Sequence, residues 1–341
     1  MPKPMTHALE ADVAAPPRFG SALRFLSSPN PGRWMSREEA IMGTAIRVEL
    51  WHADRALGEA ALDDVMREMH RIDRAMSPFK PESELSRLNR DGATKPVPVS
   101  SEMFELVERS IEFSELSEGA FDITFASVGF LFDYRSRIKP TAEQIAAALP
   151  GINYRHLRLD RMRRTIQFAR DQVKIDLGGI AKGHAVDNCI ALLKARGVVQ
   201  ALVMAGGDTR VLGDKRGRPW VIGIQDPRRK DALVARIPLV DAAISTSGDY
   251  ERYFEADGVR YHHILDPNTG TSATGMRSVT IIGPDTTTTE GISKSVFIKG
   301  PERGTRFVES LPGIDAVIID GGGHMHYTAG LRRESTATRD G

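Results

Sequence analysis

Apolar residues recur at a helical period in the first half of this chain and at a strand period in much of the second half. Between residues 54 and 76 they return every three or four positions, which predicts a long helix with one buried face. Helices are also expected over 83–89, 101–118, 141–149 and 185–196, and from 290 to 297. Alternation predicts strands at 44–51, 172–177, 199–204, 220–224, 235–239, 278–282 and 316–319. Because helices gather early and strands late, the pattern indicates an α+β fold rather than a regular βαβ alternation.

The two ends of the chain lack this periodicity. Residues 1–40 contain proline, alanine and scattered charge, so we expect a flexible N-terminal extension before a folded domain over 41–330. The polar residues 331–341 are expected to form a disordered tail. The N-terminal region has neither a signal-like apolar stretch nor a cysteine that could carry a lipid. This predicts a cytoplasmic protein, and a periplasmic location stays open.

Composition argues against several classes of protein. The 341 residues carry a formal net charge of +1, and no run of lysine and arginine is interleaved with aromatic residues, which argues against a nucleic-acid partner. No apolar run approaches the roughly 18 residues needed for a transmembrane segment. The single cysteine, Cys189, excludes an internal disulfide. It falls in a helical apolar pattern, so we expect a buried structural thiol.

Residues 261–270 (Tyr-His-His-Ile-Leu-Asp-Pro-Asn-Thr-Gly) combine two histidines with a sharp turn. Pro267 fixes its own φ and disfavours helix at the residue before it, while Gly270 permits a positive φ. A histidine held at a strand end by such a turn is well placed for proton transfer near neutral pH. The alternative is a surface hairpin that carries two histidines without a role.

Residues 176–184 (Asp-Leu-Gly-Gly-Ile-Ala-Lys-Gly-His) join a predicted strand to a predicted helix through three glycines and a lysine. The spacing matches neither the dinucleotide fingerprint nor the P-loop. Backbone N–H groups at a helix start, together with a nearby cation, nonetheless favour a phosphate ligand. A tight turn whose glycines serve only packing is the competing interpretation.

Three further segments carry weaker signals. Residues 204–208 (Met-Ala-Gly-Gly-Asp) and 245–250 (Ser-Thr-Ser-Gly-Asp-Tyr) place glycines after strands, and residues 119–124 (Gly-Ala-Phe-Asp-Ile-Thr) place an aromatic ring and a carboxylate after a helix. Each alone is compatible with a plain turn or a core phenylalanine. Together with a poised histidine they indicate a nucleotide or diphosphate ligand, which a divalent metal could accompany.

In order along the chain, these segments match the motifs of one family. The matching residues are 42–44, 76–79 with 83–89, 119–122, 176–183, 205–208, 246–250 and 263–267. On these motifs the chain resembles the ApbE family of FAD:protein FMN transferases from about residue 41 to about residue 330. The resemblance implies a T-fold-like α+β architecture.

The resemblance also implies a defined reaction. Enzymes of this family bind FAD, split its pyrophosphate, join FMN by a phosphoester bond to a threonine or serine of an acceptor flavoprotein, and release AMP. Family acceptors include membrane respiratory flavoprotein subunits. His263 corresponds to the family's catalytic base, which deprotonates the acceptor hydroxyl. His262 lacks that match and, in a strand, would point to the opposite face.

The FAD-binding positions that the resemblance implies are spread over the motifs. They are Met42, Phe79, Ala120, Phe121, Asp122, Gly178, Lys182, His184, Ser247 and Gly248. Phe79 stands where many members have a tyrosine, so ring stacking would be kept while a hydroxyl hydrogen bond would be lost.

The implied magnesium site departs from the family's pattern. The family uses a backbone carbonyl, here that of Ala181, and side chains of an Ala-Asp-x-x-x-Thr helix start, which reads Thr-Glu-Gly-Ile-Ser-Lys over 289–294. Glu290 can replace the aspartate, but Lys294 puts an ammonium where a hydroxyl ligand is expected. Lys294 could point away and leave Ser293 or water as ligand. It could instead pair with Glu290 and supply the metal's charge at the pyrophosphate, or leave a site that binds flavin without turnover.

Two other functions remain open on the sequence. Water in place of the protein acceptor would give an FAD pyrophosphatase that forms FMN and AMP. The altered metal residues also agree with a non-catalytic flavin-binding protein, which would hold intact FAD and release no AMP.

Overall fold

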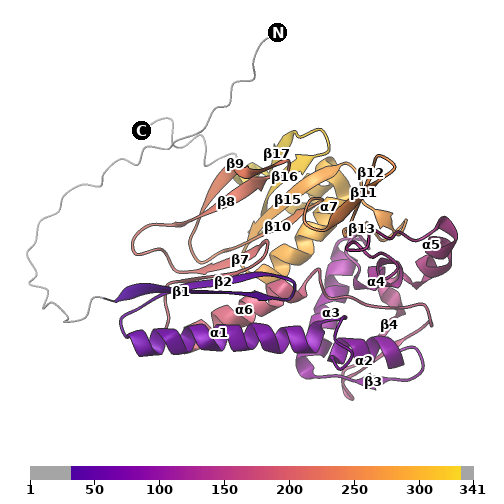
Figure 1. The fold of residues 1–341 in the computed structure, drawn as a ribbon, viewed down its shortest axis with the longest axis horizontal. Helices are drawn as coiled ribbons and strands as arrows, with labels where there is room; N and C mark the ends of the chain where they lie inside the picture. The colour runs from indigo at the N-terminus through magenta and orange to yellow at the C-terminus, as the bar shows by residue number, and fades with distance from the viewer. Residues whose placement is uncertain (1–31, 332–341) are drawn as a thin grey trace, which may run out of the picture.

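The computed structural model describes residues 32–331, which form a large sheet with helices on one face and a smaller, mainly helical part at one end (Figure 1). The sheet is antiparallel throughout. In spatial order its strands are β1 (Arg33–Ile41), β2 (Thr44–His52), β6 (Ala201–Ala205), β7 (Asp208–Leu212), β10 (Ala243–Gly248), β15 (Met276–Gly283), β16 (Asp315–Asp320) and β17 (Met325–Tyr327). The mixture of helices and antiparallel strands confirms the predicted α+β class.

The remaining strands lie outside this sheet. They are β3 (Val97–Pro98), β4 (Leu157–Asp160), β5 (Thr165–Phe168), β8 (Trp220–Asp226), β9 (Arg229–Leu239), β11 (Tyr253–Ala256), β12 (Val259–His262), β13 (Leu265–Asp266) and β14 (Thr271–Ser272). The helices are α1 (Arg55–Met76), α2 (Glu84–Asp91), α3 (Ser101–Leu116), α4 (Ala126–Gly129), α5 (Ala142–Ala148), α6 (Ala181–Ala195) and α7 (Thr286–Glu309), with 3₁₀ turns η1 (Ile123–Phe125), η2 (Leu149–Gly151) and η3 (Tyr154–His156).

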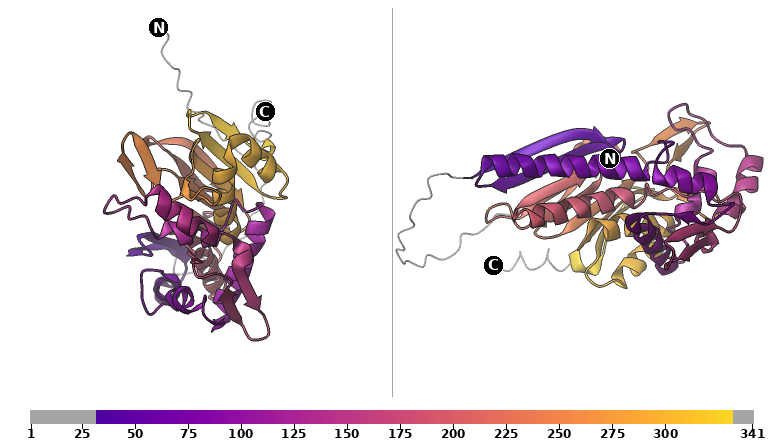
Figure 2. Two further views of the ribbon diagram at one scale, coloured as in Figure 1. Left: turned by 90° about the vertical axis from the view of Figure 1, so that its right-hand side faces the viewer. Right: turned by 90° about the horizontal axis from the view of Figure 1, so that it is seen from below.

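Helix α1 shows how the sequence pattern produces the core. Asp54 caps its N-terminus by accepting a hydrogen bond from the backbone N–H of Leu57 at 3.1 Å. The predicted apolar stripe is buried, with Leu62, Met69 and Ile72 at most 1 % exposed. This stripe packs beside α6 and against β1 and β2, and Figure 2 shows α1 and α6 lying side by side. The long predicted helix is therefore confirmed.

One carboxylate on α6 joins this helix to the N-terminus of α7. Asp187 on α6 accepts hydrogen bonds from the backbone N–H groups of Thr286 and Thr287 at 3.0 and 2.8 Å, and from both threonine hydroxyls. A carboxylate at a helix N-terminus satisfies free N–H groups and complements the helix dipole. The first turn of α7 is thereby held against α6, and Lys182 lies opposite Glu290.

One predicted strand and several predicted element boundaries are wrong. Residues 172–177 are not a strand, because the Asn89 side chain takes both backbone groups of Ile175, each at 2.8 Å. Residues 33–40, expected in a flexible extension, pair with β2 as strand β1, while 1–31 and 332–341 lie outside the described residues. Helices α6 and α7 each begin four residues earlier than expected.

Two predictions from composition can be checked in the fold. Cys189 is completely buried and its thiol contacts the carbonyl oxygen of Val65, which confirms a structural thiol. Across residues 32–331, no helix has the length and apolar character needed to span a membrane.

Candidate active site

A cavity of about 370 Å³ lies where the segment after α3, the turn before α6, the β12–β13 connection and α7 meet. Seven of the residues predicted for the site line it: Phe79, Ala120, Phe121, Asp122, Gly178, His263 and Lys294. They come from segments that are up to about 200 positions apart in the chain, as the motif order implied. A volume of this size falls in the range of ordinary small-molecule sites.

The wall of the cavity is rich in aromatic rings. Phe121 is 4 % exposed and packs edge-on against Phe113, whereas Phe79 is 81 % exposed at the rim. Phe132 and Tyr134 stack with their ring centroids 5.7 Å apart. The lining residues that sequence reasoning missed include Phe125, Phe130, Phe132 and Tyr134. These four aromatic residues fall within ten positions of a chain that is only 6 % aromatic. That clustering is the sequence signal that could have identified them.

The 261–270 turn forms as predicted and holds His263 beside the cavity. Gly270 has a φ of 67°, and its backbone N–H donates to the Asp266 carbonyl at 2.8 Å. Strand β12 ends at His262, and the next residue, His263, donates its backbone N–H to the Arg252 carbonyl at 3.2 Å. The end of β12 and the hydrogen bond to Arg252 fix the backbone at this histidine, and the turn fixes the residues that follow it.

The two adjacent histidines have different surroundings. The His262 ring packs edge-on against Phe297 and its Nε2 lies 2.8 Å from the Ala273 carbonyl oxygen, so it belongs to the core. His263 lines the cavity, and its Nδ1 is buried without a hydrogen-bond partner in the described part of the chain. Burial, followed by the positive charges of Lys294 and Arg252, lowers the pKa of His263 to about 3. Its imidazole is therefore neutral at pH 7 and can accept a proton.

Lys182 does not line the cavity but holds two carboxylates together. Its Nζ lies 2.7 Å from Asp208 Oδ2 and also forms an ion pair with Glu290. Burial lowers the pKa of Lys182, but the charges of Asp208 and Glu290 outweigh it and raise that pKa above the usual value. Lys182 is therefore charged and already paired, rather than free for a phosphate as predicted.

Lys294 is the ammonium that reaches the cavity. Its Nζ donates to Ser247 Oγ at 2.7 Å, and Ser247 Oγ lies 2.7 Å from Ser293 Oγ. Burial lowers the pKa of Lys294, and the charge of Glu290 opposes that effect. Lys294 lines the cavity and its ammonium contacts Ser247, and the three arrangements considered for it at the metal position stay predictions.

The residues at the implied magnesium position do not suit that ion. Magnesium prefers six oxygen ligands at about 2.0–2.1 Å in octahedral geometry. Here one Glu290 oxygen pairs with Lys182 and the other accepts from the Gly183 N–H at 2.8 Å. Among residues 32–331, no group of three or more histidine, cysteine, aspartate or glutamate side chains could hold a metal. Ala181 is the first residue of α6, next to Lys182, and its carbonyl could supply only one oxygen ligand.

Met42 and Gly248, which were also predicted to bind FAD, do not line the cavity, and Asp122 lines it with its carboxylate already engaged. Met42 forms the β1–β2 turn with a φ of 55° and packs on the core. Gly248 ends β10, next to the ring of Tyr250. Asp122 lines the cavity, but its carboxylate accepts hydrogen bonds from Thr124 and from the Tyr154 N–H at 2.8 Å. Its side-chain oxygens therefore stabilise the η1 turn.

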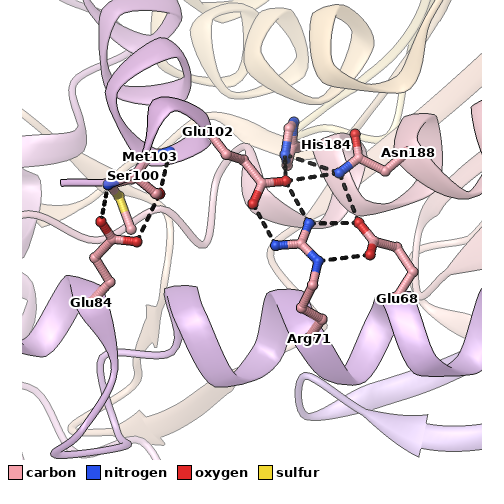
Figure 3. A network of polar contacts seen from close by, with 8 residues as sticks. All are labelled: Glu68, Arg71, Glu84, Ser100, Glu102, Met103, His184 and Asn188. Atoms are coloured by element: carbon pink, nitrogen blue, oxygen red, sulfur yellow. Dashed lines mark hydrogen bonds and ion pairs between the residues drawn. The ribbon is translucent and has the colours of Figure 1, made fainter. Parts of the chain in front are cut away.

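His184 lies in a polar network between α1, α3 and α6 rather than on the cavity wall (Figure 3). Its Nε2 is 2.9 Å from Glu102 Oε1. Arg71 lies between Glu102 and Glu68, with hydrogen bonds of 2.6–2.7 Å to both. The structure thus gives His184 a role in joining three helices.

Arg252 and Asp176 also line the cavity and were not predicted as site residues. Asp176 accepts from the Gly178 N–H at 2.7 Å, which shapes the glycine turn. Arg252 follows the 245–250 motif by two residues and is mostly exposed. An isolated arginine after a turn carries no distinguishing sequence signal.

Comparison with known proteins places this chain in a family. The model of the ApbE family matches residues 42–318. The FAD:protein FMN transferase of Treponema pallidum is 33 % identical over 321 residues, covering 88 % of each chain. The FAD:protein FMN transferase of Klebsiella pneumoniae is 34 % identical over 241 residues, covering 68 % of this chain and 69 % of that one.

Solved structures agree with the sequence relatives. The ApbE protein of Thermotoga maritima superposes with a TM-score of 0.82 at 34 % identity, covering 88 % of this chain and 99 % of that one. The flavin transferase ApbE of Vibrio cholerae has a TM-score of 0.79 at 29 % identity, covering 89 % and 99 %. Because family model, sequence and structure match over most of the chain, this protein belongs to the ApbE family.

Proposed function

We propose that this protein transfers FMN from FAD to a threonine or serine hydroxyl of an acceptor flavoprotein and releases AMP. The observation that carries the proposal is a neutral histidine, His263, and an ammonium, Lys294, on the wall of one aromatic cavity. Such a pair supplies a proton acceptor and an anion-binding group at the same place. The relatives that carry the name FAD:protein FMN transferase support the same reaction.

The aromatic wall is suited to the isoalloxazine ring of FAD. A flat ring stacks on or packs edge-on against aromatic side chains, and each such contact is worth about 0.5–1.5 kcal/mol beyond the area buried. Phe121 offers a fixed ring inside the cavity, and Phe79 offers an exposed ring that can close over a ligand. The pyrophosphate would then extend toward Lys294 and Arg252, which line the same cavity.

His263 would act as the base. The acceptor hydroxyl oxygen forms a bond to the FMN phosphorus, the bond from that phosphorus to the bridging oxygen breaks, and AMP leaves with the electron pair. The hydroxyl proton passes to the imidazole of His263. A bound pyrophosphate would offset the charges of Lys294 and Arg252, which hold the pKa of His263 down in the free protein. Substrate binding would therefore make this histidine a stronger base.

Transfer to a purified acceptor domain tests the proposal. The protein is incubated with FAD and a threonine-bearing domain of a respiratory flavoprotein subunit, and a domain with that threonine changed to valine is the control. We expect flavin fluorescence on the denatured acceptor and one AMP for each FMN attached. AMP without labelling would indicate an FAD pyrophosphatase instead. Bound, intact FAD with no AMP would indicate a flavin-binding protein.

A further inference from the structure

Two ammonium groups and two carboxylates meet beside the cavity. Lys182 bridges Asp208 and Glu290, whose side chains are 3 % and 0 % exposed, and Lys294 adds a second positive charge. Buried charges persist when they are paired. With Lys294 this group of four has no net charge, whereas with the family's threonine at 294 it would have a net charge of −1. The negative charge that would attract a cation is therefore already balanced by the protein.

The side-chain oxygens of Glu290 and the neighbouring serine hydroxyls also have hydrogen-bond partners already. Both carboxylate oxygens of Glu290 accept hydrogen bonds, one from Lys182 Nζ and one from the Gly183 N–H. Ser293 Oγ donates to the Glu290 carbonyl oxygen at 2.7 Å, and Ser247 Oγ accepts from Lys294. A metal would have to displace these donors from each oxygen it bound. The site therefore presents an ammonium that suits an anion. Its oxygen atoms do not form a cage that suits a cation.

The position of Lys294 gives it access to an anion. It lies four residues after Glu290 on α7, so the two side chains project from the same face of the helix. One of its three N–H groups donates to Ser247, which holds the ammonium at the cavity wall. Its other N–H groups can reach a phosphate that enters the cavity. Ser247 thus positions Lys294 as a fixed cation.

We propose that the Lys294 ammonium supplies the countercharge for the FAD pyrophosphate in place of a divalent metal, so that this protein binds FAD and transfers FMN without magnesium. The ligand identity rests on the proposed function. The positive charge of Lys294 is covalently attached, so it is present at any magnesium concentration. A magnesium ion, in contrast, gives up its hydration water reluctantly.

FAD affinity measured in EDTA and in excess magnesium chloride tests the metal independence directly. We expect flavin-fluorescence titrations of the wild-type protein to give dissociation constants within twofold of each other in the two buffers. Magnesium chloride alone should leave the melting temperature unchanged. A tenfold or larger gain in FAD affinity on adding magnesium would overturn the inference, even if FMN transfer itself is observed.

Variants at Lys294 test the role of its charge. Lys294→Met keeps the length of the side chain and should weaken FAD binding in EDTA at least tenfold. The double change Glu290→Asp with Lys294→Thr restores the family's pattern and should make FAD binding depend on magnesium. Lys194→Thr, at an exposed position on α6, removes the same charge and should leave FAD affinity unchanged. Wild-type-like FAD binding by Lys294→Met in EDTA, with the protein folded by circular dichroism, would contradict the inference.

These measurements separate the two proposals. FAD binding without transfer to any threonine domain would refute the transferase and leave the magnesium comparison intact. Transfer that requires magnesium would support the transferase and refute the role of Lys294.

Discussion

The ammonium of Lys182 lies 2.7 Å from the carboxylate of Asp208, where the start of α6 meets the start of β7. The same ammonium pairs with Glu290 on α7, so a single charge joins two helices and the sheet. The glycine-rich turn around Lys182 was predicted as a phosphate site. In this structure its lysine is paired with Asp208 and Glu290, and we propose Lys294 as the anion-binding group instead.

Changing Lys182 to methionine should destabilise the fold by about 3–5 kcal/mol, because a buried carboxylate is left without its countercharge. Urea denaturation followed by circular dichroism measures this loss. The double change Lys182→Met with Asp208→Asn leaves Glu290 and Lys294 as one balanced pair, and it should recover part of the lost stability. Equal stability of Lys182→Met and the wild type would show that Lys182 is not the countercharge.

Changing His263 to glutamine should lower the rate of FMN transfer by about 10²–10⁴-fold, the usual contribution of a general base. FAD affinity should stay within a few-fold, because the rest of the cavity is unchanged. Gel fluorescence gives the rate and flavin titration gives the affinity. His324→Gln, with a side chain that is 80 % exposed, is the matched control and should behave as wild type. Equal losses of FAD affinity and transfer in His263→Gln would assign this residue to binding instead.

Phe79 and Phe121, two of the phenylalanines that line the cavity, should respond differently to truncation. Phe121→Ala removes a buried ring from the core and should cost about 3–5 kcal/mol of stability. Phe79→Ala should leave the melting temperature unchanged, because its ring is 81 % exposed, but should weaken FAD binding by the roughly 0.5–1.5 kcal/mol of an aromatic contact. A Phe79→Ala variant with unchanged FAD affinity would exclude this ring from the binding site.

Stability should fall in two steps as the pH is lowered. The folded-state pKa of His263 is lowered to about 3, so between its unfolded pKa of about 6.5 and that value the unfolded state binds more protons. Stability is therefore lost as the pH falls below 6.5, with a slope of at most about 1.4 kcal/mol per pH unit from this group. His262, whose pKa is lowered mainly by burial, acts in the same direction. His263→Gln should flatten the step between pH 6.5 and 4.5.

Glu102 should govern the second step. Burial raises the pKa of Glu102, but hydrogen bonds from His184 and Arg71 outweigh it and lower that pKa below 4.5 (Figure 3). Its contribution is complete above pH 4.5 and is lost as the pH falls further. Denaturation of Glu102→Gln as a function of pH should thus differ in slope from the wild type only below pH 4.5. A change confined to the range above pH 5 would contradict this assignment.

What the sequence predicted well depends on local chemistry. The α1 stripe, the short helices expected over 83–89 and 141–149 and the 261–270 turn follow from local sequence patterns, and all are present. Residues 172–177 look like a strand because alternate side chains are buried, yet their hydrogen bonds go to Asn89, more than 80 positions away. The pairing of Lys182 with Asp208 and Glu290 likewise depends on contacts between distant elements. No periodicity or spacing in the chain encodes such a contact, so the charge group could only be seen in three dimensions.

A single methyl group at Gly183 can perturb the pairing of Lys182 with Glu290. A Cβ at this position would lie 2.5 Å from the carbonyl oxygen of Thr286, which is backbone and cannot rotate away. Gly183→Ala should therefore push α7 from α6 and cost about 1–3 kcal/mol, although alanine favours a helix by about 1 kcal/mol over glycine. The same shift would lengthen the hydrogen bond from the Gly183 N–H to Glu290, so FAD affinity should fall as well.

Urea denaturation and flavin titration of Gly183→Ala test both effects. Lys194→Ala, at an exposed position of the same helix, is the control and should change neither. If Gly183→Ala were more stable than the wild type, helix propensity would outweigh the contact with Thr286, and the close approach of α6 and α7 could not be what holds Glu290 against Lys182. A loss of stability together with weaker FAD binding would show that the spacing of these two helices sets the geometry of the charge group beside the cavity.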